Sequence, residues 1–104
     1  MGRTTFQLNC SDNQMAYNTI CTILASRGYQ YVFENNEYVW KQGIGLLTAV
    51  KYIKVEFPAD HVILLTGWIR PLLFPEMALD NGFVGLIPKQ EAMSAINQIR
   101  ANIR

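Results

Sequence analysis

The stretch YQYVFENNEYVWKQ, residues 29–42, decides the fold because it contains two alternating runs separated by Asn35-Asn36. Asparagine tolerates the positive φ that a two-residue hairpin turn requires, so residues 29–34 and 37–42 are predicted to form antiparallel strands. One face of this hairpin is almost wholly aromatic, and aromatic cross-strand pairs each contribute about 0.2–1 kcal/mol. The predicted pairs on that face are Phe33 with Tyr38, Tyr31 with Trp40, and Tyr29 with Gln42.

The two faces of the hairpin are expected to differ in burial. The aromatic face is core if it lies under helices, whereas the opposite face, which carries most of the charged residues, is expected to be mostly solvated. A two-residue turn also sets Glu34 opposite Glu37, which is a mild like-charge cost. A four-residue turn would relieve that cost without exchanging the faces, so both turns predict the same buried side.

The residues before the hairpin predict a helix. Ser11 and Gln14 match a capping box, and Cys10 and Met15 take the positions of a hydrophobic staple around it. A helix is therefore predicted over residues 11–27, where the following glycine is a typical stop. Its apolar stripe comprises Ala16, Ile20, Ile23 and Leu24.

Alternating side chains predict the remaining strands at residues 4–8, 47–57 and 61–70, with a turn at 58–60 and a short edge strand at 76–79. The strand at 61–70 is apolar on both faces, which is typical of a central strand or of one whose second face is covered. A last helix is predicted to follow, with a proline in its first turn. Its apolar stripe comprises Ala92, Ile96, Ile99 and Ile103.

These elements give the order β-α-β-β-β-β-α. Consecutive hairpins imply an antiparallel sheet, and two amphipathic helices must bury their apolar stripes against one of its faces. The predicted fold class is therefore α+β, a curved antiparallel sheet with two helices packed on one face, formed by a single domain over residues 1–104. This order resembles the TATA-binding-protein-like and helix-grip arrangements, and such a resemblance in topology says little about function.

Composition and net charge limit the cellular location and the classes of binding partner that this chain is expected to have. Half of the residues are hydrophobic and only 16% are charged, so disorder is not expected. The net charge of +1 provides little attraction for nucleic acid. The N-terminal residues lack an apolar signal region, and no run is long enough to span a bilayer. Cys10 and Cys21 would lie about 16 Å apart along a helix, too far for a disulfide. We expect a cytoplasmic protein without membrane insertion.

Five short motifs follow one another through most of the chain: RGY at 27–29, YVWKQGIG at 38–45, YIK at 52–54, GWI at 67–69 and GFVGLIPK at 82–89. Together they resemble an uncharacterised family of small bacterial α+β domains. The Val-Trp-Lys-x-Gly-x-Gly and Gly-Phe-Val-Gly-x-x-Pro-Lys patterns are the most specific parts. Relatives carry an added zinc ribbon, but this chain has no Cys-x-x-Cys, so no zinc role transfers. The resemblance implies the fold and no particular activity.

The residue types that catalysis requires are scarce. His61 is the sole imidazole and follows Asp60 in a predicted turn, where adjacent side chains tend to point apart. A zinc site needs three or four ligands at close spacing, and one histidine with two distant cysteines does not supply them. The glycines at 43 and 45 join two strands and lead to no helix N-terminus, so the chemistry of a phosphate loop is missing. We expect no enzymatic activity, no metal and no cofactor.

Aromatic and basic residues could also indicate nucleic-acid binding. If the aromatic hairpin face lies under the helices, however, its rings belong to the core and cannot stack on bases. Together with the low net charge, this makes nucleic acid a poor candidate partner. The glycine-flanked Ile44 and the nearby Leu46 are expected either to fold back on the core or to face a partner.

Binding through apolar surface is the leading hypothesis. Two short helices cover only one side of the sheet, so apolar residues elsewhere exceed what the chain can readily hide, and contiguous exposed apolar patches usually mark interfaces. We therefore expect a non-catalytic bacterial interaction domain that forms a homodimer or binds another protein partner. The alternative is a small apolar ligand held in a pocket between the sheet and the helices. The candidate interface or ligand-facing residues are Ile44, Leu46, Trp68, Leu72, Leu73 and Phe74.

Overall fold

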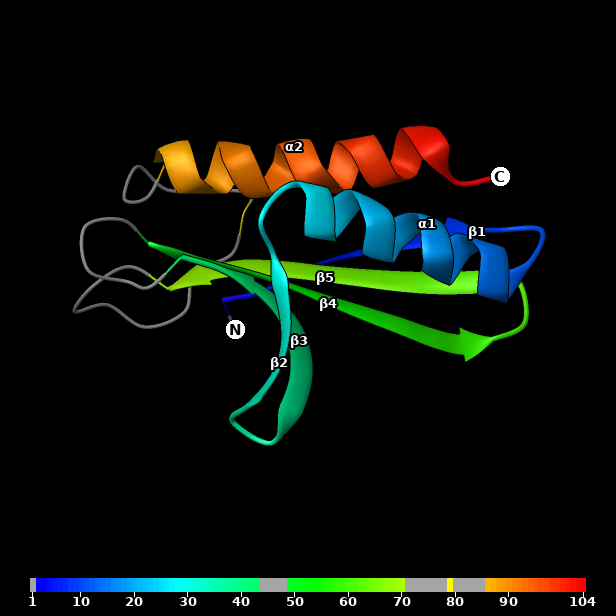
Figure 1. Ribbon diagram of the computed structural model, residues 1–104, viewed down its shortest axis with the longest axis horizontal. Coiled ribbons are helices and arrows are strands. Elements are labelled where there is room, and N and C mark those ends of the chain that lie inside the picture. Colours follow the sequence, from blue (N-terminus) through cyan, green and yellow to red (C-terminus); the bar gives the residue numbers. More distant parts are fainter. Residues whose placement is uncertain (1, 44–48, 71–78, 80–85) are drawn as a thin grey trace.

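The computed structural model describes residues 2–43, 49–70, 79 and 86–104. Five strands form one antiparallel sheet in the order β1-β5-β4-β3-β2, and both helices lie on the same face of it (Figure 1). The predicted α+β fold class and the order β-α-β-β-β-β-α are confirmed. The elements are β1 (Thr4–Asn9), α1 (Asn13–Ser26), β2 (Gln30–Glu34), β3 (Glu37–Gln42), β4 (Val50–Ala59), β5 (Val62–Arg70) and α2 (Leu86–Asn102).

The start of α1 differs from the predicted capping box. Asp12 is the N-cap, and its side chain accepts a hydrogen bond from the backbone N–H of Met15 at 3.1 Å. Ser11 instead donates its hydroxyl proton to the carbonyl of Arg104 at 3.0 Å. Met15 is 68% exposed, so the predicted hydrophobic staple is wrong as well. The cap lies one residue later because Ser11 ties the start of α1 to the C-terminal end of the chain.

The core lies between the sheet and the two helices. The predicted stripe of α1 is buried, and in α2 Ala92, Ile96 and Ile99 are buried and Ile103 is partly buried, as predicted. Strand β5 pairs with β1 on one side and β4 on the other, which confirms its central position. Its inward side chains and those of β4 complete this core: Ile53, Ile63, Leu65 and Ile69.

Gly67 lets α2 approach the middle of β5. A Cβ atom at this position would lie 2.6 Å from Cδ1 of Leu79 and 3.0 Å from Cδ1 of Ile96. Both neighbouring side chains are buried, so they have little room to move.

We predict that Gly67→Ala lowers the free energy of unfolding by about 1–3 kcal/mol, because overpacking forces buried side chains from their positions. Urea titration monitored by tryptophan fluorescence measures this change. Gly28→Ala is not a suitable control because Gly28 has a positive φ of 87°. Ala101→Ser at an exposed position in the last turn of α2 is suitable, since it adds one heavy atom without overpacking. A neutral or stabilising Gly67→Ala would contradict the close approach.

The connection between β4 and β5 is shorter than predicted. Strand β4 continues through Pro58 to Ala59, with a register irregularity between Glu56 and Ala59, and the turn is formed by Asp60 and His61. A bulge accommodates the proline, which cannot donate to a regular ladder. His61 adopts a positive φ of 67°.

The β2–β3 hairpin has the predicted two-residue turn. Asn35 and Asn36 adopt φ values of 54° and 65°, and the pairing sets Phe33 opposite Tyr38 and Glu34 opposite Glu37. The four-residue alternative is therefore wrong. The hairpin bends away from the helices towards its turn (Figure 1). This bend decides which aromatic residues the helices can cover.

Candidate protein-binding surface

Most of the predicted site residues lie outside the described residues: Ile44, Leu46, Leu72, Leu73 and Phe74. The same holds for the predicted edge strand at 76–78. Trp68 is described, and it is only 2% exposed. Its ring stacks on Tyr52 at a centroid distance of 5.2 Å, and the Arg3 guanidinium lies 3.6 Å above it. Trp68 is therefore part of a buried cluster, and its side chain offers little exposed surface to a partner.

The sheet face opposite the helices carries a second core, which we call the outer-face cluster: Val39, Val50, Tyr52 and Trp68. Val32 is partly buried against it. Val39 is 1% exposed, although it belongs to the hairpin face that was predicted to be mostly solvated. That prediction is wrong because the charged side chains of this face do not extend into water. They lie across the aromatic rings and pair with one another.

The two glutamates beside the turn hold these cations in place. Glu37 accepts two hydrogen bonds from Arg3, at 2.7 and 3.0 Å, and one from Lys54 at 3.1 Å. The Arg3 hydrogen bonds and then that of Lys54 lower the pKa of Glu37 to about 2 against the opposing effect of burial. Each glutamate is thus neutralised by its own cations, which removes the cost of placing Glu34 opposite Glu37.

The second glutamate is tied to the outer-face cluster. Glu34 accepts hydrogen bonds from Lys41 at 2.8 Å and from the hydroxyl of Tyr52 at 2.5 Å, and both lower its pKa. Burial, followed by this bond to Glu34, raises the pKa of Tyr52 to about 12. Arg70 donates to the same hydroxyl at 2.8 Å. These bonds join β2, β3, β4 and β5 and hold the hairpin rigidly against the sheet.

The opposite face of the hairpin exposes three adjacent aromatic rings, which we call the aromatic patch. Tyr31 is 52% exposed, Phe33 59% and Tyr38 58%. Tyr38 stacks on Tyr31 at a centroid distance of 5.6 Å and contacts Phe33 at 4.7 Å. This face is therefore core only in part. These three residues are exposed, whereas Tyr29 is 5% exposed and Trp40 is 8% exposed.

The bend of the hairpin explains why some of these rings are buried and others are exposed. Trp40 pairs with Ile53 of β4 and belongs to the core beneath the helices. The other three rings lie nearer the turn, where the hairpin bends away from α1 and α2 (Figure 1). The sequence contains a pattern that indicates this exposure. The aromatic pairs of the hairpin continue up to its turn, and residues beside the turn lie far from the centre of the sheet, which the two helices cover.

Strand β2 also forms one edge of the sheet. In the described part of the chain, β2 pairs with β3 alone, and its burial alternates between exposed and half-buried residues. At the other edge, the apolar residues of β1 behave differently. Phe6 and Leu8 pack against the core, and Arg100 lies over the ring of Phe6 at 5.5 Å. The edge at β2 thus differs from that at β1 by carrying exposed rings.

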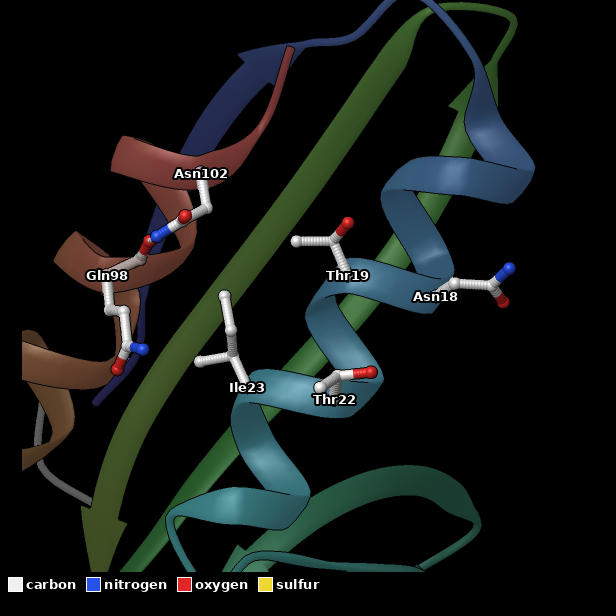
Figure 2. A pocket seen from close by; sticks show the side chains of 6 residues that line it. All are labelled: Asn18, Thr19, Thr22, Ile23, Gln98 and Asn102. Atoms are coloured by element: carbon white, nitrogen blue, oxygen red, sulfur yellow. Dashed lines mark hydrogen bonds between the residues drawn. The ribbon is translucent and has the colours of Figure 1, made fainter.

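Described residues line several hollows, and polar side chains contribute to the lining of three of them. One of about 380 Å³ lies between α1 and α2, where Thr19 and Ile23 point towards Gln98 and Asn102 (Figure 2). A second of about 490 Å³ lies at the base of the hairpin. A third, of about 510 Å³, is lined by Arg27, Tyr29, Gln42, Gly43, Lys51 and Glu91. Three of these six side chains are charged, which does not suit an apolar ligand.

The sole histidine has a structural position. The backbone N–H of His61 donates to the side-chain oxygen of Asn13 at 2.9 Å, and its Nδ1 lies 3.0 Å from the carbonyl oxygen of Cys10. Asn13 also donates to the carbonyl of Ala59 at 3.2 Å and thereby anchors the β4–β5 turn to the start of α1. No sequence pattern indicated this role of Asn13. Within residues 2–43, 49–70, 79 and 86–104, no group of three or more His, Cys, Asp or Glu is placed to hold a metal ion.

Both cysteines are free thiols, and Cys10 donates to the side chain of Asn13 at 3.2 Å. No helix in the described part of the chain is long and apolar enough to cross a membrane. Comparison with protein-family models, with curated proteins and with solved structures found no match for this chain. The resemblance to a family of small bacterial domains therefore stays a prediction.

Proposed function

We propose that this chain is a non-catalytic interaction domain that self-associates through the aromatic patch. The observation that carries the proposal is the contact between Tyr31, Phe33 and Tyr38, three rings that are each more than half exposed. Single exposed apolar residues are ordinary, whereas a contiguous aromatic group is typical of protein interfaces. The rings are also held in place by the network on the opposite hairpin face, so binding costs little ordering of side chains.

The size of the patch supports a weak complex. A buried aromatic side chain removes about 150–250 Å² from water, so three half-exposed rings offer roughly 300 Å² per copy. Complete burial of the rings of two copies would remove at most roughly 600 Å², which is below the about 1,200 Å² of standard specific interfaces. We therefore expect a dimer with a dissociation constant on the order of 100 μM.

The charge distribution favours a protein over a nucleic acid. Aromatic stacking on bases is effective when basic residues beside the rings track the phosphate backbone. Here Arg3, Lys41 and Lys54 lie on the opposite hairpin face and are paired with Glu37 or Glu34. The small-ligand alternative has less support, because the hollow lined by Arg27, Lys51 and Glu91 carries three charged side chains and the one between α1 and α2 is lined by Asn, Thr and Gln side chains as well as Ile23.

The first test replaces a ring of the patch. We predict that Phe33→Thr raises the dissociation constant of the dimer at least about tenfold, since buried aromatic anchors dominate the energy of small interfaces. Threonine preserves strand propensity at this position. Sedimentation velocity between about 10 μM and 1 mM measures the association.

Met15→Gln is the matched control, because Met15 is also an exposed apolar residue but lies on α1, away from the patch. It should leave the dissociation constant unchanged. A wild-type protein that stays monomeric throughout this concentration range would refute self-association, as would a Phe33→Thr variant that associates like the wild type.

A further inference from the structure

We infer that two copies of the chain join edge to edge through β2, as antiparallel strands related by a twofold axis at Val32. The inference rests on the proposed self-association and adds the residues and the register. The resulting sheet would be continuous across the two copies, and the two aromatic patches would lie side by side on the same face of it.

The backbone of β2 offers hydrogen-bonding groups in the required positions. In a two-residue hairpin the residues that flank the turn form a hydrogen-bonded pair, and such pairs alternate with non-bonded ones along the strands. Glu34 and Glu37 flank this turn, so Glu34, Val32 and Gln30 direct their N–H and C=O groups to β3. Tyr31 and Phe33 consequently direct theirs outwards, to the edge of the sheet.

The length of β2 determines the register of the pairing between the two copies. Strand β2 has five residues, and an axis at the middle residue, Val32, is the only twofold arrangement that pairs all of them. Tyr31 then lies opposite Phe33 of the second copy and exchanges two hydrogen bonds with it, and the symmetric pair adds two more. In this register the hydrogen-bonded pairs consist of Tyr31 and Phe33, the two residues whose backbone groups point outwards. The rings of these residues also lie on one face and form a new aromatic contact.

The side chains on the other face of β2 are compatible with this register. Gln30 lies opposite Glu34 of the second copy, so no two like charges meet across the axis. Native edge strands commonly carry lysine, proline or a bulge that prevents such pairing. Strand β2, with the sequence QYVFE, contains neither lysine nor proline, and its pairing with β3 is regular throughout.

A cysteine at the axis tests the geometry directly. In a non-bonded antiparallel pair the Cα atoms are about 4.5 Å apart, within the range of a disulfide. Val32→Cys treated with diamide as oxidant should therefore form a covalent dimer on a non-reducing gel, faster than the wild type with its two native cysteines. Gln30→Cys is the control, since two residues at position 30 would be separated by about 13 Å along the strands. The register is overturned if Gln30→Cys cross-links as fast as Val32→Cys.

A charge at position 30 tests the register without a covalent bond. Gln30 is exposed and lies opposite Lys41 within its own hairpin and opposite Glu34 of the second copy. Gln30→Lys should lower the dissociation constant of the dimer about fivefold and slightly lower the free energy of unfolding. Gln30→Glu should raise the dissociation constant and slightly raise the free energy of unfolding. The opposite directions of the two effects separate association from folding. The same substitutions at the exposed Gln90 on α2 should leave association unchanged.

The outcomes distinguish this inference from the proposed function. Association that Phe33→Thr weakens, combined with no preferred cross-link at Val32 and no response to charge at Gln30, overturns the edge pairing and preserves the aromatic interface. Absence of association in the wild type removes both. A cross-link specific to Val32→Cys together with opposite effects of Gln30→Lys and Gln30→Glu supports the pairing.

Discussion

Replacing Trp68 with alanine is expected to lower the free energy of unfolding by about 3–5 kcal/mol, the usual cost of truncating a buried tryptophan. The side chain is 2% exposed, stacks on Tyr52 and lies beneath the guanidinium of Arg3. Its removal would leave a cavity and would also remove the cation–π contact between the Arg3 guanidinium and the ring. Urea titration at neutral pH measures the change.

The size of this loss separates the two interpretations of Trp68. An exposed interface residue would cost about 0.5 kcal/mol or less, because surface substitutions rarely change stability by more. Trp68→Phe is the matched control, since it keeps an aromatic ring for the stack with Tyr52 and should retain a good part of the stability. A loss below about 1 kcal/mol for Trp68→Ala would contradict the buried outer-face cluster.

Glu37 is expected to make the stability of the fold depend on acid. Its pKa is lowered to about 2 by the hydrogen bonds of Arg3 and Lys54, whereas the unfolded chain has an ordinary value of 4.5. A lowered pKa stabilises the fold fully at pH values above 4.5, and this contribution is lost as the pH falls towards 2. The shift corresponds to about 2–3 kcal/mol for a carboxylate whose side chain is 17% exposed.

Glu37→Gln should therefore lower the free energy of unfolding by about 2–3 kcal/mol at pH 7 and by about 1 kcal/mol at pH 3, where roughly 40% of the contribution remains. Urea titrations at the two pH values measure the difference. Glu56→Gln is the control, because Glu56 is more exposed and lies 3.9 Å from Lys54. It should have little effect at either pH. An equal loss for Glu37→Gln at both pH values would show that the carboxylate contributes through packing and not through its charge.

The two faces of the hairpin have complementary roles. Ion pairs and the buried Val39 fix one face against the sheet, and the aromatic patch occupies the other. A rigid hairpin presents the three rings in a defined arrangement, so association pays less conformational entropy than it would with a mobile hairpin. Glu37→Gln is accordingly expected to weaken association slightly as well, through a looser hairpin.

Local patterns predicted the elements well. The turn at Asn35-Asn36 and the pairs of the hairpin depend on neighbours in the chain, and the structure confirms them. The apolar stripe of each helix follows from spacing alone. Boundaries were less certain, because Asp12 rather than Ser11 caps α1 and β4 continues through Pro58. These differences arise from contacts with distant residues, among them Arg104 at the other end of the chain.

The sequence by itself determined the order of the elements, the register of the hairpin and the α+β class, because each depends on side chains only a few residues apart. Only the tertiary structure decided which hairpin face is buried. An alternating sequence pattern shows that the two faces of a strand differ. Which face is buried depends on which residues the helices cover and on whether the charged side chains form ion pairs. Arg3, 34 residues before Glu37, is one such partner, and it covers Trp68 as well. The tertiary structure therefore places Trp68 in a buried cluster and adds the aromatic patch as a candidate surface.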